Sequence, residues 1–242
     1  STLINREIHI VATYRELTDQ ELSGIIRNKF HRPRLEEDIQ VALQIISKIT
    51  RLHKVSEDSH LVVSRNLFGV NIRGARLPKN TDLSYFFLDN SQLDYVAIPT
   101  ESKLIRTRIC NSDVRGAFMA GVDLSHSDLS GSALEHITLR QATLIKTRFL
   151  TSRLACANFI EVIAKEVNFN QAKLRKAAFS RANLQKANFG FADLREASLN
   201  EADLREADFS NANLSQGNFK GAKLNGTKLY KANLTDAQDL TH

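Results

Sequence analysis

The chain holds 242 residues with a formal net charge of +6, and 42% of its residues are hydrophobic. A chain of this length can bury the core of one elongated domain with a smaller appendage. Its longest apolar stretches are a handful of residues, far short of the ~20 that cross a bilayer, and Ser1 is not followed by the basic-then-apolar segment of a secretion signal. We therefore expect no membrane span and a cytoplasmic location.

The N-terminal residues 1–60 do not repeat, and their signals are helical. Thr18 and Glu21 form a capping box that predicts a short helix ending near residues 31–33. A second, amphipathic helix is predicted over 35–54, where apolar residues recur at helical spacing. Residues 7–11 fit a strand or a helix, and both alternatives stay open. We therefore predict an N-terminal helical cap over 1–60 and a second domain over 61–242.

A five-residue period opens the second domain, but its first part is interrupted. Leu67, Ile72 and Leu77 keep the period, one residue is added near Pro78, and another is added near Pro99. An added residue that fits no inward position is expected to bulge outward at a corner. We interpret the aromatic run over 85–87 as the seat of the amphipathic helix rather than as a ligand site.

From Leu104 to Leu234 every fifth residue is apolar, which gives 27 consecutive positions. No helix has this period. The residue two places before each apolar one is small, most often Ala, with Ile137 as the single bulky exception. Both positions must therefore point inward, which indicates a solenoid whose stacked repeats share a continuous core.

Six successive units over 182–211 read Ala-Asn-Leu-Gln-Lys, Ala-Asn-Phe-Gly-Phe, Ala-Asp-Leu-Arg-Glu, Ala-Ser-Leu-Asn-Glu, Ala-Asp-Leu-Arg-Glu and Ala-Asp-Phe-Ser-Asn. This stretch resembles the pentapeptide-repeat family, whose unit is A-(D/N)-(L/F)-x-x. The resemblance implies a mainly β fold, a right-handed quadrilateral β-helix with one unit per side and four units per coil. The segment 38–46 is similar to the helical lead-in of many bacterial members, which implies an N-terminal α-helical cap over the open end of the β-helix.

A four-sided coil places residues 20 apart directly above one another, at about the ~4.8 Å spacing of neighbouring strands. Charges at that spacing alternate in sign in three columns, which are Lys146, Glu166, Lys186 and Glu206; Glu161, Arg181 and Glu201; and Arg108, Asp128 and Arg148. Arg175 above Arg195 fits no ladder, and mixed charge on a solvated surface is the alternative explanation. The inward Phe residues fall on two opposite sides, so we expect a filled interior without a substrate cavity.

Residue types that carry catalysis are present but are not spaced for it. The segment 125–128, Ser-His-Ser-Asp, has triad residue types whose side chains point in different directions on such a wall. His126 and His136 fall on opposite sides, so their spacing does not suit a metal. We therefore predict no enzymatic activity, no metal and no cofactor. Cys110 and Cys156 fall on different sides, so we expect free thiols of a reducing compartment.

Formal charge is unevenly distributed along the repeats. Residues 103–186 hold 14 basic against 6 acidic side chains, whereas residues 187–214 hold 2 basic against 6 acidic ones. The rod therefore has a basic middle followed by an acidic belt. Some members of the resembled family are similar to duplex DNA in shape and negative charge and protect type II topoisomerases from quinolones. This chain departs from that pattern in the sign of its charge.

The function that we favour is a non-enzymatic protein-interaction scaffold that presents a rigid, charged β-helix surface to a protein partner. Ile145, Ile160 and Ile163 are expected to lie near one another beside Ala164, the only small residue in the central inward series. In the alternative, Ile163 turns inward to fill the space that Ala164 leaves. The full candidate partner surface is Ile145, Ile160, Ile163, Lys173, Arg175 and Lys176.

Two other functions stay open, together with a possible homodimer. DNA-mimic topoisomerase (gyrase) protection would rest on the acidic belt, which is Asp193, Glu196, Glu201, Asp203, Glu206 and Asp208. Nucleic-acid binding would use the basic middle of the rod, but its side chains spread over several sides and lack interleaved aromatics, so we expect no nucleic-acid partner. Thin cover on the last coil predicts a homodimer edge at Leu229, Tyr230 and Leu234.

Overall fold

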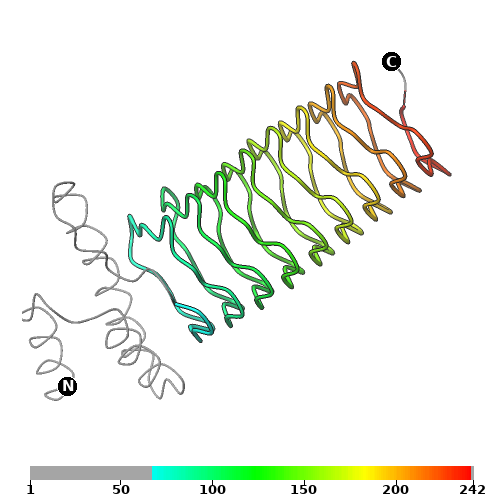
Figure 1. The fold of residues 1–242 in the computed structure, drawn as a ribbon. Coiled ribbons are helices and arrows are strands. Elements are labelled where there is room, and N and C mark those ends of the chain that lie inside the picture. The colour runs from blue at the N-terminus through cyan, green and yellow to red at the C-terminus, as the bar shows by residue number, and fades with distance from the viewer. Residues whose placement is uncertain (1–66, 241–242) are drawn as a thin grey trace, which may run out of the picture.

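A computed structural model describes residues 67–240 as one straight rod of stacked coils, with Leu67 and Leu240 at opposite ends (Figure 1). Within this range the structure has no helix, and no strand is longer than one bridging residue. Each five-residue unit contributes one bridging residue, which in most units pairs in parallel with both the coil before it and the coil after it. The architecture is a quadrilateral β-helix, as the resemblance to the pentapeptide-repeat family implies, and the five-residue period correctly predicts a solenoid.

Four columns of parallel bridges define four walls, which we name A to D. Wall A contains the bridged residues Asp82, Lys103, Asp123, Thr143, Ile163, Asn183, Asp203 and Lys223. The corresponding columns run from Phe87 to Lys228 on wall B, from Asn71 to Asn233 on wall C and from Arg76 to Gln238 on wall D. Because the chain visits the walls in the order A, B, C, D, wall A lies opposite wall C and wall B lies opposite wall D.

The two added residues lie where the sequence predicts them. Bridges on wall A join residues 103 and 123, and 123 and 143, so a regular coil takes 20 residues. The bridges Asn71 to Gln92 and Asp82 to Lys103 each span one residue more. Pro78 lies inside the first of these coils and Pro99 inside the second, and both prolines are partly exposed at the ends of wall D. The 20-residue register above Lys103 is therefore regular.

The backbone N–H groups of one unit show why the repeat has its sequence, because a folded chain must pair each of them. In the unit 187–191, the N–H of the first residue, Ala187, donates to a carbonyl three residues earlier at 3.0 Å. The second, Asn188, donates to the previous coil at 2.9 Å, and the third and fifth donate to the next coil at 2.7 and 3.0 Å. Only the fourth N–H, of Gly190, has no backbone partner, and the Asn188 Oδ1 accepts it at 2.9 Å. Asp or Asn at the second position therefore completes the pairing.

The interior is filled by the third residues of the units, as the sequence predicts. Phe149, Phe169, Phe189 and Phe209 stack along wall B, with ring centroids 5.0, 5.1 and 4.6 Å apart. Phe159 and Phe179 stack at 4.8 Å on the opposite wall D and meet the first set edge-on. Leucines of walls A and C complete the core, and all these side chains are fully buried. Rings that enter from two facing walls, together with these leucines, therefore fill the interior.

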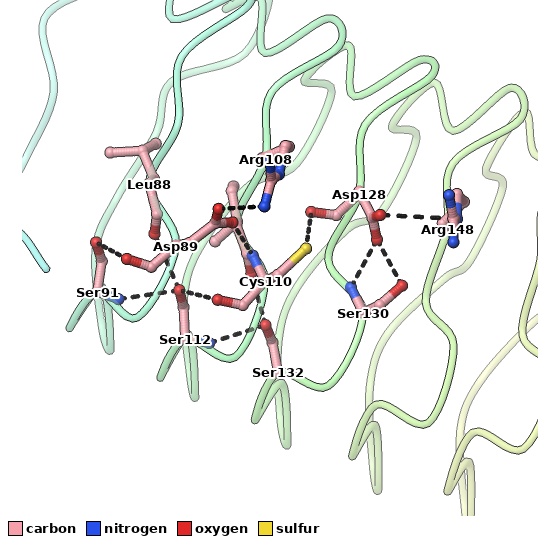
Figure 2. Close-up of polar contacts among 11 residues, drawn as sticks. Leu88, Asp89, Ser91, Arg108, Cys110, Ser112, Asp128, Ser130, Ser132 and Arg148 are labelled. Carbon is pink, nitrogen blue, oxygen red and sulfur yellow. Dashed lines mark hydrogen bonds and ion pairs between the residues drawn. The ribbon is translucent and has the colours of Figure 1, made fainter. Parts of the chain in front are cut away.

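In the first coils the small inward position often carries a hydroxyl instead of Ala. On wall C, Ser112 is buried, donates to the carbonyl of Leu88 at 3.0 Å and accepts from the N–H of Ser91 at 3.0 Å. Ser132 accepts from the N–H of Ser112 at 3.0 Å in the next coil (Figure 2). The hydroxyls of Ser112 and Ser132 are therefore each satisfied by two backbone groups, which offsets the cost of burying them, whereas the buried Ser102 hydroxyl has no such partner within residues 67–240.

Several N-terminal predictions fall outside the part of the chain that the structure describes. The helical cap over 1–60, its two helices and the domain boundary near residue 60 lie outside residues 67–240. The predicted seat of the second helix lies within the described residues: Phe86 is buried, whereas Tyr85 is exposed at the corner between walls A and B and Phe87 is exposed on wall B. Residues 67–240 contain no helix that is long and apolar enough to cross a membrane.

Candidate interaction surface

The second, fourth and fifth residues of each unit form the outer surface, because the first and third residues fill the core. The fifth residues lie at the corners, and most of them take a positive φ near 60°, such as His126 and Lys186. Every side chain that can meet a partner therefore belongs to a wall or a corner. The position of a residue within its unit decides which of these it joins.

The structure places the three isoleucines on or beside wall A. Ile163 lies on wall A and its side chain is 46% exposed, so the alternative in which it fills the space beside Ala164 is wrong. Ile145 lies on the same wall one coil earlier and is half-buried. Ile160 is also half-buried and lies at the end of wall D, just before the corner that leads to Ile163. Ile160 and Ile163 therefore flank that corner, whereas Ile145 lies toward the other end of wall A; we call these three side chains the isoleucine region.

The basic members of the candidate partner surface lie on the opposite wall. Lys173 and Arg175 belong to wall C, and Lys176 occupies the corner that follows. Glu196 of the next coil pairs with Arg175 and, at 3.3 Å, with Lys176. The structure does not bring these cations together with the isoleucines of wall A, so one flat partner cannot contact both groups.

Ion pairs between coils confirm parts of the predicted charge columns. Lys146 pairs with Glu166 at 3.4 Å, and Lys186 pairs with Glu206 at 3.6 Å in the same corner column. Arg181 contacts Glu201 at 3.0 Å and also reaches Glu161 at 3.9 Å, and Arg148 contacts Asp128 at 3.7 Å. Pairs as exposed as these contribute little to stability, because solvent and salt screen them. Arg175 above Arg195 is tolerated because Arg195 pairs with Asp193 at 2.7 Å while Arg175 pairs with Glu196.

The acidic belt surrounds the rod instead of covering one wall. Its six residues occupy walls A, B and C and three successive corners within a single coil. Five of the six are neutralised by basic side chains, as in the pairs Asp203 with Arg205 at 2.7 Å and Glu201 with Arg181 at 3.0 Å. Hydrogen bonds from Arg205 hold the pKa of Asp203 well below its usual range, and Ser210 lowers the pKa of Asp208 in the same way. The belt therefore does not present a continuous face of free negative charge.

On wall B, a thiol lies within a cluster of charged groups (Figure 2). Asp89 pairs with Arg108 at 2.7 Å and accepts the N–H of Cys110 at 2.8 Å. The Cys110 thiol donates to the carbonyl of Asp128 at 3.6 Å, and the carboxylate of Asp128 faces Arg148. Burial, aided by the charges of Asp128 and Asp89, raises the pKa of the Cys110 thiol to about 11. A thiol that stays protonated at neutral pH is a poor nucleophile.

Other chemistry-bearing residues are also held in structural hydrogen bonds. The Ser125 hydroxyl donates to Asp123 at 2.6 Å, and the Ser127 hydroxyl is buried and donates to the carbonyl of Leu104. Both cysteines are free, with Cys156 exposed. No cluster of three or more His, Cys, Asp or Glu side chains within residues 67–240 is arranged to hold a metal ion.

At the C-terminal end, core side chains become partly exposed. Leu229 and Leu234 are half-buried, whereas the equivalent Phe209 and Leu214 of the coil before are fully buried. Tyr230 is 65% exposed, and the ammonium of Lys231 lies 5.2 Å from the centroid of its ring. The three residues of the predicted homodimer edge therefore share one end of the described rod.

The sequence analysis missed three aromatic side chains that the structure leaves more than half exposed. Tyr95 and Phe118 are each 58% exposed, and Phe191 is 62% exposed. The sequence contains a signal for their exposure, because each is an aromatic residue at the second or fifth position of its unit, where the repeat usually has polar residues. Tyr95 and Phe118 lie close together where wall C meets wall D, and Phe191 lies alone at a corner after wall B.

Comparison with known proteins identifies the repeat region. A family model described as pentapeptide repeats matches residues 102–141, 165–200 and 202–237, with 8 copies. HetL, a pentapeptide repeat protein involved in heterocyst differentiation regulation from the cyanobacterium Nostoc sp. strain PCC 7120, is 27% identical, with a TM-score of 0.41; the match covers 78% of this chain and 94% of that chain. No curated protein matches the chain.

Two further solved structures are similar over shorter parts of the chain. A pentapeptide repeat protein of the Arabidopsis thaliana thylakoid lumen is 37% identical over 33% of this chain and 56% of that chain, with a TM-score of 0.33. Trypsin-treated QnrB1, a plasmid-mediated fluoroquinolone resistance protein, is 19% identical over 63% of this chain and 83% of that chain, with a TM-score of 0.41. With its 20-residue coils and filled interior, the repeat region of this chain belongs to the pentapeptide-repeat family and folds as its right-handed quadrilateral β-helix.

Proposed function

We propose that the chain is a non-enzymatic scaffold that presents its outer walls to a protein partner. The observation that carries this proposal is the filled interior, in which the core residues from Leu104 to Phe219 are shielded from solvent. A rod without an internal cavity offers only its surface for recognition. Its exposed charges are largely paired within the surface, which leaves apolar side chains such as Ile163 as the groups that gain most from being covered.

For this function we favour the isoleucine region of wall A over the cations of wall C. Apolar side chains that lose contact with water drive association at about 25 cal/mol per Å², whereas Arg175 and Lys176 already have Glu196 as a partner. Partner capture from the native host would use the wild-type chain and an Ile163→Asp variant. Asn183→Asp is a matched control, because Asn183 occupies the same column one coil further along. Loss of a captured protein in I163D but not in N183D supports the proposal, and equal capture by both variants contradicts it.

The two other functions have specific tests of their own. DNA mimicry requires free negative charge, but the basic partners of Glu196, Glu201, Asp203 and Glu206 reduce it. If the purified chain restored the supercoiling activity of gyrase in the presence of a quinolone, that result would support DNA mimicry. Nucleic-acid binding would show as association with duplex DNA that weakens steeply as salt rises. The basic middle is neutralised in the same way by pairs such as Arg153 with Glu135 at 2.8 Å, so we expect neither result.

The remaining proposals concern the two ends of the chain and its location. We propose that residues 1–60 cap the first coil and that Leu229, Tyr230 and Leu234 form a weak homodimer edge, because the last described coil leaves these side chains partly exposed. Light scattering at high concentration would show a dimer that Tyr230→Asp dissociates, and a strictly monomeric wild type would contradict the edge. The free thiols of Cys110 and Cys156 support a cytoplasmic location.

A further inference from the structure

We infer that the first coils carry a second docking surface, on wall D, for a protein segment that presents a large apolar side chain beside a carboxylate. We call this surface the aromatic shelf and define it as Tyr95, Ala97, Pro99, Phe118 and Ala120. The inference rests on the proposed scaffold function and names a surface and a partner chemistry for it. None of the shelf residues belongs to the isoleucine region of wall A.

Tyr95 forms one end of the shelf because a glycine lies above it in the next coil. A Cβ on Gly116 would meet two ring carbons of Tyr95 at 2.7 and 2.8 Å, so only glycine lets the ring lie across this corner. The Arg73 guanidinium lies 6.0 Å from the centroid of the same ring and is itself bound to Asp94 at 2.7 Å. The ring is therefore held against the rod with 58% of its surface open. A ring that is already positioned loses little entropy on binding.

Phe118 forms the other end, and its neighbours on wall D are small and uncharged. It bridges Ala97 in the coil before and Thr138 in the coil after, so its two direct neighbours in the column carry no charge. Pro99 and Ala120 border the same column and are partly exposed. Several other exposed rings have cations over them, with Arg108 5.4 Å from Phe87 and Lys231 5.2 Å from Tyr230. No side chain within residues 67–240 covers Phe118 in this way.

A free cation at one end of the shelf decides the chemistry of the occupant. Arg76 bridges Ala97 directly below the shelf, about 10 Å from Phe118 along the rod at two strand spacings. Its side chain is exposed, and no carboxylate within residues 67–240 pairs with it. By contrast, most arginines further along the rod have an acidic partner. A ligand that places an apolar group over the two rings and a carboxylate beside Arg76 would therefore cover the apolar surface and pair the cation.

The position of the shelf favours a partner protein over the chain's own N-terminal segment. That segment enters the rod at Leu67 on wall B, and the exposed Phe87 lies on the same wall in the next coil. Wall D is the opposite wall, so one helix cannot cover Phe87 and Phe118 together. The shelf itself contains no carboxylate, so a second copy placed shelf against shelf in a two-fold contact would leave Arg76 without an acidic partner.

The test is a selection of random dodecapeptides displayed on phage against the full-length wild-type chain. We expect enriched peptides to carry an aromatic residue or Leu close to Asp or Glu. A synthetic consensus peptide should bind Phe118→Ser at least about tenfold more weakly, the loss typical of an interface anchor. Gly116→Ala should weaken binding as well, because it displaces the Tyr95 ring without removing an aromatic group. It should still fold, because His136 occupies the same corner of the next coil at a φ of 60°.

The controls separate the shelf from other surfaces. Phe191→Ser removes an equally exposed ring from another corner and should leave peptide affinity unchanged. Arg76→Glu should weaken the acidic peptide and restore binding of a peptide whose acid is replaced by Lys. The inference is overturned if no peptide is enriched, if F118S binds as tightly as wild type, or if enriched peptides are basic.

Two further readouts test the other occupants. Displacement of the selected peptide by a synthetic peptide of residues 35–54 would assign the shelf to the chain itself and overturn the inference. A dimer in light scattering that F118S dissociates would assign the shelf to a second copy, with the same consequence. If instead I163D abolishes peptide binding and F118S does not, the shelf is wrong while the scaffold function stands. If the host partner capture also finds nothing, the scaffold function itself fails.

Discussion

Replacing Phe169 by Leu isolates the contribution of the aromatic stack to the stability of the rod. Phe169 meets four other rings: it is stacked on Phe149 and Phe189 at 5.0 and 5.1 Å, and it is edge-on to Phe159 and Phe179 at 5.3 and 5.7 Å. The substitution removes all four contacts. Leu fits this kind of position, because Leu129 occupies the equivalent site of wall B and is fully buried.

The expected loss follows from the ring contacts rather than from volume. An aromatic pair contributes about 0.5–1.5 kcal/mol beyond the area it buries. Four pairs that share one ring do not add fully, so we expect F169L to lose about 2–4 kcal/mol of unfolding free energy. Phe219→Leu is the matched control: Phe219 is equally buried, but the residue below it in its column is Leu199. F219L should cost less than about 1.5 kcal/mol, as for a near-isosteric core exchange.

Urea unfolding followed by far-UV circular dichroism measures both variants, because the chain has no Trp. Equal slopes against urea would show that the two variants expose the same surface on unfolding, so that the midpoints can be compared. Phe169→Ala, which leaves a cavity in addition, should cost about 3–5 kcal/mol. The reasoning is refuted if F169L is no less stable than F219L, since the stacked rings would then contribute no more than any buried apolar group.

Three further predictions concern the charged and polar groups. At pH 8 iodoacetamide should alkylate the exposed Cys156 at least about tenfold faster than Cys110, whose raised pKa keeps it protonated, and equal rates in a mass-spectrometric time course would contradict this assignment. Hydrogen bonds from Arg115, Arg195 and Arg205 lower the pKa values of Asp113, Asp193 and Asp203, respectively. The three carboxylates therefore contribute their full share of folding stability above the unfolded-state pKa of about 3.9, and this share is lost as the pH falls below that value. A D113N/D193N/D203N variant should show a shallower loss of thermal stability between pH 5 and 2 than the wild type, and parallel profiles would exclude these pairs as the cause. Ser132→Ala should cost about 1–3 kcal/mol because it leaves the buried N–H of Ser112 without its acceptor, whereas Ala172→Ser at the same inward position of wall C should be nearly neutral in the same unfolding assay.

Much of the rod could be predicted from single residues and their spacing. The period places Leu184, Phe189 and every equivalent residue in the core, and the added residues at Pro78 and Pro99 lengthen two coils as expected. The candidate surface was less predictable. Ile163 and Lys173 are ten residues apart, and that spacing already places them on opposite walls, although both were assigned to one surface.

A rule based on columns of residues 20 apart does not predict every ion pair. Arg153 pairs with Glu135, 18 residues earlier, and Arg175 pairs with Glu196, 21 residues later. Long side chains reach diagonally across neighbouring coils, so the partner depends on which acceptor is within reach. The charge balance of a segment therefore does not show how much of its charge is free, which is why the acidic belt looks more negative in the sequence than on the rod.

The sequence by itself determined the coil, the four walls and the filled core. The first and third residues of each unit can be accommodated only in the interior. Asp or Asn at the second position accepts the N–H of the fourth residue, which has no backbone acceptor. Only the tertiary structure decided which outward groups remain free. The Tyr95 ring is exposed because Gly116, 21 residues later, leaves room for it in the next coil. Arg76 has no acidic partner within the described rod, whereas most later arginines have one. Those outcomes depend on the contacts between adjacent coils, and a linear pattern does not specify them.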